Sequence, residues 1–104
     1  MNGGGPMLLE RTGVAGSLES CDALVMVILS PDREGVEIEL ESPSIASFGE
    51  EMKRAVIETL ESLDVQHGYV KVQDRGSLDC TLRARTETAA RRALAAPYGE
   101  KVEE

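Results

Sequence analysis

The sequence contains very few aromatic side chains: its 104 residues include one phenylalanine, two tyrosines and no tryptophan. Surfaces that stack the bases of single-stranded nucleic acid depend on such side chains, so we expect no platform of that kind. No apolar run approaches the length of a membrane span, and the first ten residues lack the basic start and apolar centre of a secretory signal. We therefore expect a cytoplasmic protein that does not bind membranes.

Cysteine and histidine are equally scarce, with Cys21, Cys80 and His67 as the only examples. They are widely separated, whereas a zinc site needs about four ligands that usually occur in close pairs, so no metal site is expected. The spacing alone does not exclude a disulfide between the two cysteines, but a reducing cytoplasm disfavours one. A small enzyme with one of these cysteines as nucleophile stays open as an alternative, and His67 would then have to be its base.

Basic residues are almost missing from the first half of the chain. Residues 1–52 hold ten acidic and two basic side chains, residues 53–104 hold nine of each, and the net charge of the whole chain is −8. An acidic surface repels nucleic acid and anionic membranes, which both require cationic contacts. It suits a protein partner with a basic surface, or it serves only to keep the domain in solution.

Three segments have the patterns of β-strands. Residues 23–29 form an uninterrupted apolar run, which favours a strand covered on both faces. Residues 36–41 alternate strictly between apolar residues and glutamates, which predicts a strand with a solvated face, and residues 69–73 alternate in a similar way. We expect the first two strands to form a hairpin and the run 23–29 to be the central strand.

Two helices complete the predicted fold. Ser42 and Ser77 are candidate N-caps for them. An apolar stripe marks the core side of the first helix, formed by Ile45, Phe48, Met52, Val56, Leu60 and Leu63. The predicted fold class is α+β: a small, mainly three-stranded mixed sheet in β-β-α-β-α order with two helices packed on it.

The domain organisation follows from the same patterns and from chain length, since 104 residues suffice for one domain. We expect a flexible, glycine-rich lead over residues 1–13, one domain over 14–96 and an acidic tail over 97–104. The chain contains no nucleophile elbow, P-loop or dinucleotide-binding glycine pattern. By its residues alone it is a small acidic binding or carrier domain.

Two longer motifs point further. Residues 15–22, AGSLESCD, resemble the N-terminal signature of the acyl carrier subunit, or gamma chain, of citrate lyase, and residues 76–87, GSLDCTLRARTE, resemble its second signature. The resemblance covers residues 14–96. The fatty-acid type of carrier is a helical bundle with an Asp-Ser-Leu attachment motif, and this motif is absent here.

The resemblance implies that Ser20 carries phosphoribosyl-dephospho-coenzyme A, joined by a phosphodiester after the action of a prosthetic-group transferase. The thiol of this group would hold acetyl or citryl as a thioester. An alpha subunit would exchange acetyl for citryl, and a beta subunit would release oxaloacetate. Citramalate lyase has the same carrier architecture, so the substrate stays open between citrate and citramalate.

The neighbours of Ser20 are weaker candidates. Glu19 and Asp22 flank the serine, and a basic transferase surface would recognise them, although solvated loop acids are about as good an explanation. We also expect Arg85, or Arg83 on the same helix, to balance the phosphodiester or to bind a partner. A further alternative is a non-catalytic domain that assembles a lyase complex without carrying any group.

Overall fold

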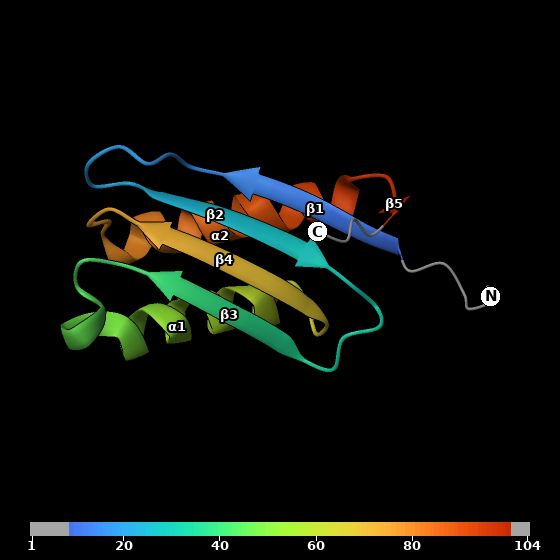
Figure 1. Cartoon of the computed structure of the whole chain (residues 1–104), viewed down its shortest axis with the longest axis horizontal. Helices are drawn as coiled ribbons and strands as arrows, with labels where there is room; N and C mark the ends of the chain where they lie inside the picture. The colour runs from blue at the N-terminus through green and yellow to red at the C-terminus, as the bar shows by residue number, and fades with distance from the viewer. Residues whose placement is uncertain (1–8, 101–104) are drawn as a thin grey trace.

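The computed structural model describes residues 9–100 of the chain. Its elements are β1 (Leu9–Ala15), β2 (Ala23–Leu29), β3 (Val36–Glu41), α1 (Ile45–Ser62), β4 (Gly68–Asp74), α2 (Asp79–Ala95) and β5 (Gly99–Glu100). Figure 1 shows one mixed sheet with both helices on the same face. The α+β class and the two helices packed on a small mixed sheet are thus confirmed, but the sheet has more strands than predicted.

The order of strands differs from the prediction. The sheet runs β3-β4-β2-β1-β5, in which β3 and β4 are parallel and the other neighbours are antiparallel. The prediction that β2 and β3 form a hairpin is therefore wrong, because β4 lies between them. Helix α1 connects β3 to β4, which lies directly beside β3 and parallel to it. The three elements therefore form a βαβ unit.

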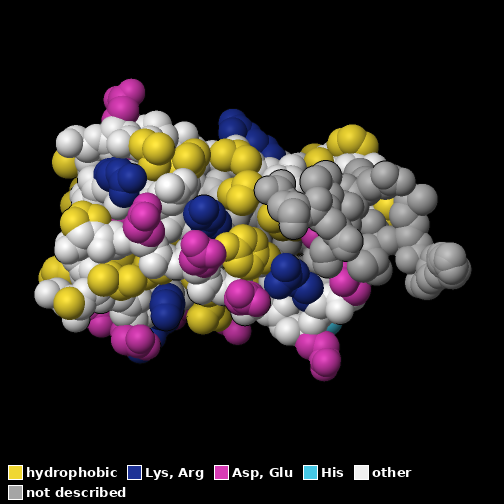
Figure 2. Space-filling view, viewed as in Figure 1, with side chains coloured by type: hydrophobic (Ala, Val, Ile, Leu, Met, Phe, Trp, Pro, Cys, Tyr) yellow, Lys and Arg dark blue, Asp and Glu magenta, His cyan; other side chains and the backbone are white. Residues whose placement is uncertain are grey.

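The prediction that β2 is covered on both faces is also wrong. Its residues alternate between fully buried and half-buried positions along the whole strand. Ala23, Val25 and Val27 point into the core below the helices, whereas Met26 lies on the opposite, open face. Since both helices cover the same side of the sheet, the apolar side chains of the other side are left among charged ones (Figure 2).

Residues 9–13 were assigned to the flexible lead, and residues 14–20 were expected either to form an edge strand or to run extended over the surface. The structure instead has a strand, β1, over Leu9–Ala15. Residues 11–15 of this strand pair with β2, and Leu9 and Glu10 pair with the short β5, which lies inside the predicted tail. Gly13 explains how α2 covers this strand: a Cβ at this position would lie 2.1 Å from the carbonyl oxygen of Ala89. Residues 1–8 of the lead and 101–104 of the tail lie outside the described part.

The apolar stripe of α1 is only partly confirmed. Val56 and Leu60 are buried, and Met52 and Leu63 pack against the core. Ile45 and Phe48, in the first turns of the helix, are exposed. The helix starts beyond the end of the sheet that it covers, so its first turn has nothing beneath it.

The described part of the chain, residues 9–100, contains no helix with the length and the hydrophobicity that a membrane span requires.

Candidate functional site

Three connections meet at one end of the sheet. They are the β1–β2 turn (16–22), the β3–α1 connection (42–44) and the β4–α2 turn (75–78), all on the left of Figure 1. Two hydrogen bonds extend the pairing of β2 with β4 into the first and third of these turns. The Cys21 amide donates to the Arg75 carbonyl at 2.8 Å, and the Arg75 amide donates to the Asp22 carbonyl at 2.9 Å.

Ser20 lies at the tip of the β1–β2 turn. The Asp22 amide closes this turn with a 3.2 Å hydrogen bond to the Glu19 carbonyl, and Cys21 has a left-handed φ of 65°. A positive φ at the third of four turn residues is the geometry of a type II turn, in which the second residue projects outward. The side chain of Ser20 is exposed, and its hydroxyl forms no hydrogen bond within residues 9–100.

The turn contains a second hydroxyl, Ser17, which has a different environment. Ser17 is half-buried, its hydroxyl donates to the Asp22 carboxylate at 2.8 Å, and its oxygen accepts from the Glu19 amide at 3.2 Å. Ser17 is therefore part of the support of the turn. Of the two hydroxyls, only that of Ser20 is both exposed and free of hydrogen bonds within residues 9–100.

Asp22 connects the turn to helix α2. One carboxylate oxygen accepts hydrogen bonds from Arg85 Nε at 2.8 Å and from the Ala23 amide at 2.7 Å, and the other accepts from Ser17. The hydrogen bonds from Arg85, Ser17 and Ala23 lower the pKa of Asp22 from 3.8 to about 2. The carboxylate is thus charged at neutral pH, and its pair with Arg85 fixes the base of the turn.

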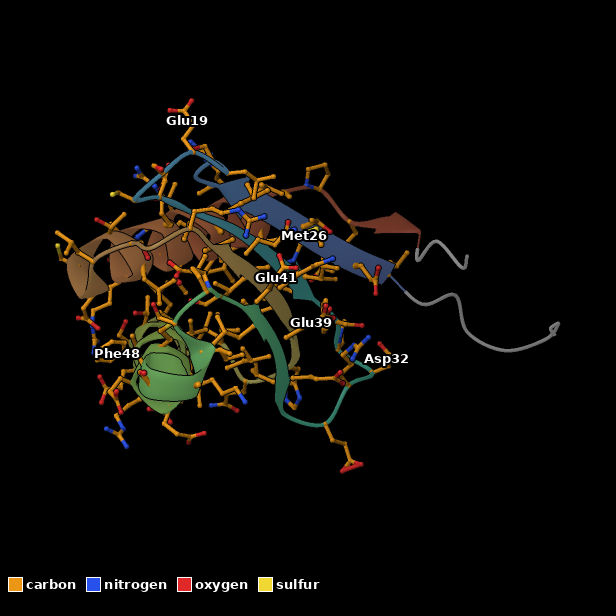
Figure 3. All side chains as sticks on the ribbon, turned by 60° about the vertical axis from the view of Figure 1, so that its left-hand side comes forward. Glu19, Met26, Asp32, Glu39, Glu41 and Phe48 are labelled. Atoms are coloured by element: carbon orange, nitrogen blue, oxygen red, sulfur yellow. The ribbon has the colours of Figure 1, made fainter. Side chains whose placement is uncertain are left out.

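The other candidate recognition residues lie apart from this pair. Glu19 is exposed and projects away from the turn (Figure 3). Arg83 does not reach the turn, because its guanidinium binds Asp79 at 2.7 Å and Glu58 of α1 at 2.9 Å. Of the two arginines considered in the sequence, Arg85 is the one that the fold brings to the Ser20 turn.

Asp74 organises the neighbouring turn, and sequence reasoning missed it. It is 0% exposed, and its carboxylate accepts hydrogen bonds from the hydroxyls of Ser42 and Ser77 and from the amides of Gly76 and Ser77. Burial raises the pKa of Asp74, but the hydrogen bonds from Ser77, Ser42 and Gly76 outweigh burial and hold that pKa below its ordinary value. The sequence signal that could have revealed this turn is an aspartate at the end of a strand, followed three residues later by a serine.

The two serines on Asp74 were predicted to be helix caps, and this is wrong. The N-cap residues are Ser44 for α1 and Leu78 for α2, and neither makes a side-chain capping hydrogen bond. Ser42 and Ser77 instead donate their hydroxyls to Asp74. The buried charge of Asp74 attracts the hydroxyls that would otherwise cap the helices.

The row of glutamates on β3 is not a free anionic stripe. Arg33 pairs with Glu37 at 3.4 Å, the Tyr69 hydroxyl donates to Glu39, and Arg75 pairs with Glu41 at 3.6 Å. The hydrogen bond to Glu39 is the main reason why the pKa of Tyr69 is raised to about 12. Figure 3 shows Glu39 and Glu41 on the open side of the sheet that also bears Met26.

A cysteine–histidine pair is not assembled. Cys21 and Cys80 are both free and exposed. His67 precedes the first residue of β4, and the register places Gly68 opposite Leu29 and Asp74 opposite Ala23, so β4 separates His67 from Cys21. Seven extended residues span about 20 Å, which is too far for proton transfer. Within residues 9–100, no three His, Cys, Asp or Glu side chains are grouped so that they could hold a metal ion.

The site belongs to a small α+β domain that presents an exposed hydroxyl, that of Ser20, on a supported turn. A family model described as malonate decarboxylase delta subunit (MdcD), abbreviated ACP, matches residues 10–93. The class is therefore that of acyl carrier proteins.

Curated relatives define the family more closely. The chain is 44% identical to the citrate lyase acyl carrier protein of Streptococcus mutans, with 84% of each chain covered. It is 42% identical to that of Lactiplantibacillus plantarum, over 85% of this chain and 90% of the relative. For that of Halothermothrix orenii, the identity is 40% over 84% of this chain and 90% of the relative. The chain belongs to the citrate lyase acyl carrier protein family.

Proposed function

We propose that this protein is the acyl carrier subunit of citrate lyase and that Ser20 is the residue to which its prosthetic group is attached. Family membership supports the carrier role. The observation that carries the choice of residue is the contrast between the two hydroxyls of the turn. Ser17 is half-buried and bonded to Asp22, whereas Ser20 is exposed with a hydroxyl that is free of hydrogen bonds within residues 9–100.

The residues around Ser20 fit a group attached through a phosphodiester. The hydroxyl lies at the tip of a turn whose base is held by Asp22–Arg85 and by the backbone bonds to Arg75, so a transferase can reach it without unfolding the strands. Arg85 holds the base of the turn through Asp22, and the Arg75 side chain pairs with Glu41, so neither guanidinium is reserved for a phosphodiester. The proposed group is phosphoribosyl-dephospho-coenzyme A, which supplies a thiol that holds the acyl group as a thioester.

The chemistry would then belong to partner subunits. An alpha subunit would exchange acetyl for citryl on the carrier, and a beta subunit would cleave the citryl thioester. A tether keeps the acyl group at high effective concentration for both active sites, which explains why a carrier needs a rigid base below a mobile arm. In this role the protein positions the prosthetic group, and the group supplies the reactive thiol.

A carrier of malonate decarboxylase is the second candidate, because the matching family model is described by that enzyme. Incubation of the loaded carrier with the alpha subunit alone and with citrate, citramalate or malonate, followed by the mass of the acyl group on the carrier, distinguishes the three systems. The proposal expects a citryl group only with citrate.

The test of the site is Ser20→Ala, compared with Ser47→Ala as a matched control on the exposed side of α1. We expect Ser20→Ala to assemble with the alpha and beta subunits but to abolish citrate cleavage, and we expect the control to retain full activity. Retention of activity by Ser20→Ala would show that the domain only assembles the complex.

A further inference from the structure

An apolar groove lies between the first turns of the two helices. It has a volume of about 310 Å³ and is lined mainly by Phe48 and Met52 of α1, by Leu78 and Leu82, and by Glu51 and Asp79 at its rim. Leu82 is buried and Met52 half-buried, so the floor of the groove is continuous with the core. Figure 3 shows Phe48 on the first turns of α1, close to the start of α2.

The walls of the groove are unusually exposed for their residue types. Phe48 is 55% exposed and Leu78 is 69% exposed, and Phe48 is the one phenylalanine of the chain. Exposed apolar side chains that line one concave surface commonly mark a site of interaction. Phe48 and Leu78 are not needed to pack the helices on the sheet, because Val56, Leu60 and Leu82 already fill the space between the helices and the sheet.

The groove is adjacent to the Ser20 turn. The Cys21 amide donates to the carbonyl of Arg75, and Leu78 follows Arg75 by only three residues. Paired strand residues lie about 5 Å apart and three residues extend about 10 Å at most, so Leu78 lies within roughly 16 Å of Cys21. A protein that binds the domain around Ser20 can therefore also contact the groove.

The rim of the groove is acidic. Glu51 forms no ion pair within residues 9–100, and Glu50 beside it forms none either. Asp79 pairs with Arg83, but the same arginine also neutralises Glu58. The groove thus combines an apolar floor and walls with an excess of negative charge, which complements an apolar side chain bordered by lysine or arginine.

We propose that this groove is the docking site for a protein subunit that processes the acyl group, and that the subunit inserts an apolar side chain flanked by basic residues. The inference rests on the proposed carrier function. Phe48 and Leu78 supply most of the apolar contact, and Glu51 supplies charge complementarity. Binding at this site brings the partner's active site to the side of the domain that carries Ser20.

The test measures the dissociation constants of the purified alpha and beta subunits for the full-length carrier. The Phe48→Ala/Leu78→Ala double variant is expected to bind at least one of these subunits about tenfold more weakly or worse, because buried aromatic and aliphatic anchors dominate such interfaces. Glu51→Lys is expected to weaken the same interaction several-fold and to reduce its salt dependence. Since all three side chains are exposed, the variants should retain the circular dichroism spectrum of the wild type.

Two matched controls come from the same helix. Ile57→Ala removes an apolar side chain that is 43% exposed outside the groove, and Glu61→Lys reverses a charge that also lies outside it. Both controls should bind within twofold of the wild type. Unchanged binding of the double variant and of Glu51→Lys to both subunits would overturn the inference, as would wild-type chain that binds neither subunit.

Two combinations of results distinguish a failure of the docking inference from a failure of the proposed function. If the mass of the wild-type carrier shows a loaded Ser20 while the groove variants bind normally, the docking inference is wrong and the proposed function stands. If Ser20 is never loaded but the groove variants lose binding, the attachment site is wrong and the docking site stands. A wild-type dimer that the double variant converts to monomer in sedimentation would assign the groove to a second copy of the chain and overturn the proposal.

Discussion

Two neighbouring turns at one end of the sheet each depend on an aspartate, but the two aspartates work in different surroundings. Asp74 is fully buried and is satisfied by hydroxyls and amides of its own turn and of the β3–α1 connection. Asp22 is partly exposed and is satisfied mainly by Arg85 from α2. The first arrangement makes a rigid end to the sheet, and the second holds up a turn whose tip stays accessible.

The difference separates structural support from the site itself. The network around Asp74 joins the end of β4 to the β3–α1 connection and the β4–α2 turn, and the Ser20 turn is then attached to it through the backbone of Arg75. A charged pair at the surface is adjustable at low cost, because water competes for both partners. The fold thus gives a free hydroxyl a fixed base without burying it.

The largest expected effect comes from the loss of the buried carboxylate. Asp74→Ala leaves the hydroxyls of Ser42 and Ser77 and the amides of Gly76 and Ser77 without their acceptor. An unpaired buried polar group costs about 1–3 kcal/mol. Because Ser42 and Ser77 are half-buried and Gly76 is exposed, water replaces part of these bonds, and we expect a loss of about 2 kcal/mol or more in the free energy of unfolding. For a domain of this size the midpoint of thermal unfolding should fall by roughly 10 °C or more.

The comparison requires that Asp22→Ala has a clearly smaller effect on the same thermal midpoint, since the Asp22 carboxylate is itself partly exposed and accepts three hydrogen bonds rather than four. Equal losses for the two alanine variants would contradict the distinction between a buried and a surface aspartate. Urea unfolding monitored by circular dichroism gives an independent measure of both free energies.

A smaller effect on stability but a direct effect on the site is expected from Arg85→Ala. The hydrogen bond from Arg85 is the main reason why the pKa of Asp22 is about 2, so the variant should move this pKa toward 3.8. Because the pKa of Asp22 is lower in the folded chain than in the unfolded chain, its ionisation stabilises the fold fully above about pH 4. This contribution is lost as the pH falls toward 2. Carboxyl resonances in an NMR titration of both proteins measure this shift.

The same variant should slow the loading of Ser20 by the prosthetic-group transferase about fivefold or more, because the base of the turn is released. Arg91→Ala is the control, since it removes a surface pair with Glu87 on the same helix at a distance from the turn. Equal loading rates for the two variants, measured from intact masses over time, would show that the Asp22–Arg85 pair does not position the site.

The smallest effects concern the backbone of the two turns. Cys21 has a φ of 65° and Gly76 a φ of 85°, and of these two residues only the glycine adopts this region without strain. We expect Gly76→Ala to destabilise the fold by about 1 kcal/mol and Cys21→Gly to be neutral or stabilising by up to about 1 kcal/mol. Loading of Ser20 in Cys21→Gly should match the wild type, and a loss of loading would assign the cysteine side chain a part in recognition.

The sequence predicted the elements of the fold correctly where a residue pattern is compatible with only one type of element. The alternation of β3 and β4 and the helical spacing of α1 identified these elements correctly. Most of strand β1 was missed because its inward positions, Gly13 and Ala15, are small to admit α2, and small residues carry little hydrophobic signal. The order of strands was missed because the short loop after β2 predicts a hairpin with β3, whereas β4 lies between these strands; the prediction that the run 23–29 is the central strand is confirmed.

The site was predicted unevenly for similar reasons. The motif around Ser20 is local, so the sequence sufficed to nominate this residue, and its role as the attachment point stays a prediction. Arg85 was nominated as a partner of the phosphodiester, whereas the structure pairs it with Asp22, 63 positions away in the chain. The role of Asp74 requires Ser42, 32 positions away, and the exposure of Phe48 requires knowledge of where the sheet ends. Such contacts between distant segments are set by the fold and have no counterpart in a local pattern.

The most direct test of the account is the intact mass of the carrier, purified from cells that make the complete lyase system, followed by peptide mapping. The account predicts a mass increment equal to phosphoribosyl-dephospho-coenzyme A on the peptide that contains residues 17–22, with fragmentation that assigns it to Ser20 and leaves Ser17 unmodified. An unmodified Ser20 in material whose transferase is active, or a group on any other residue, would contradict it.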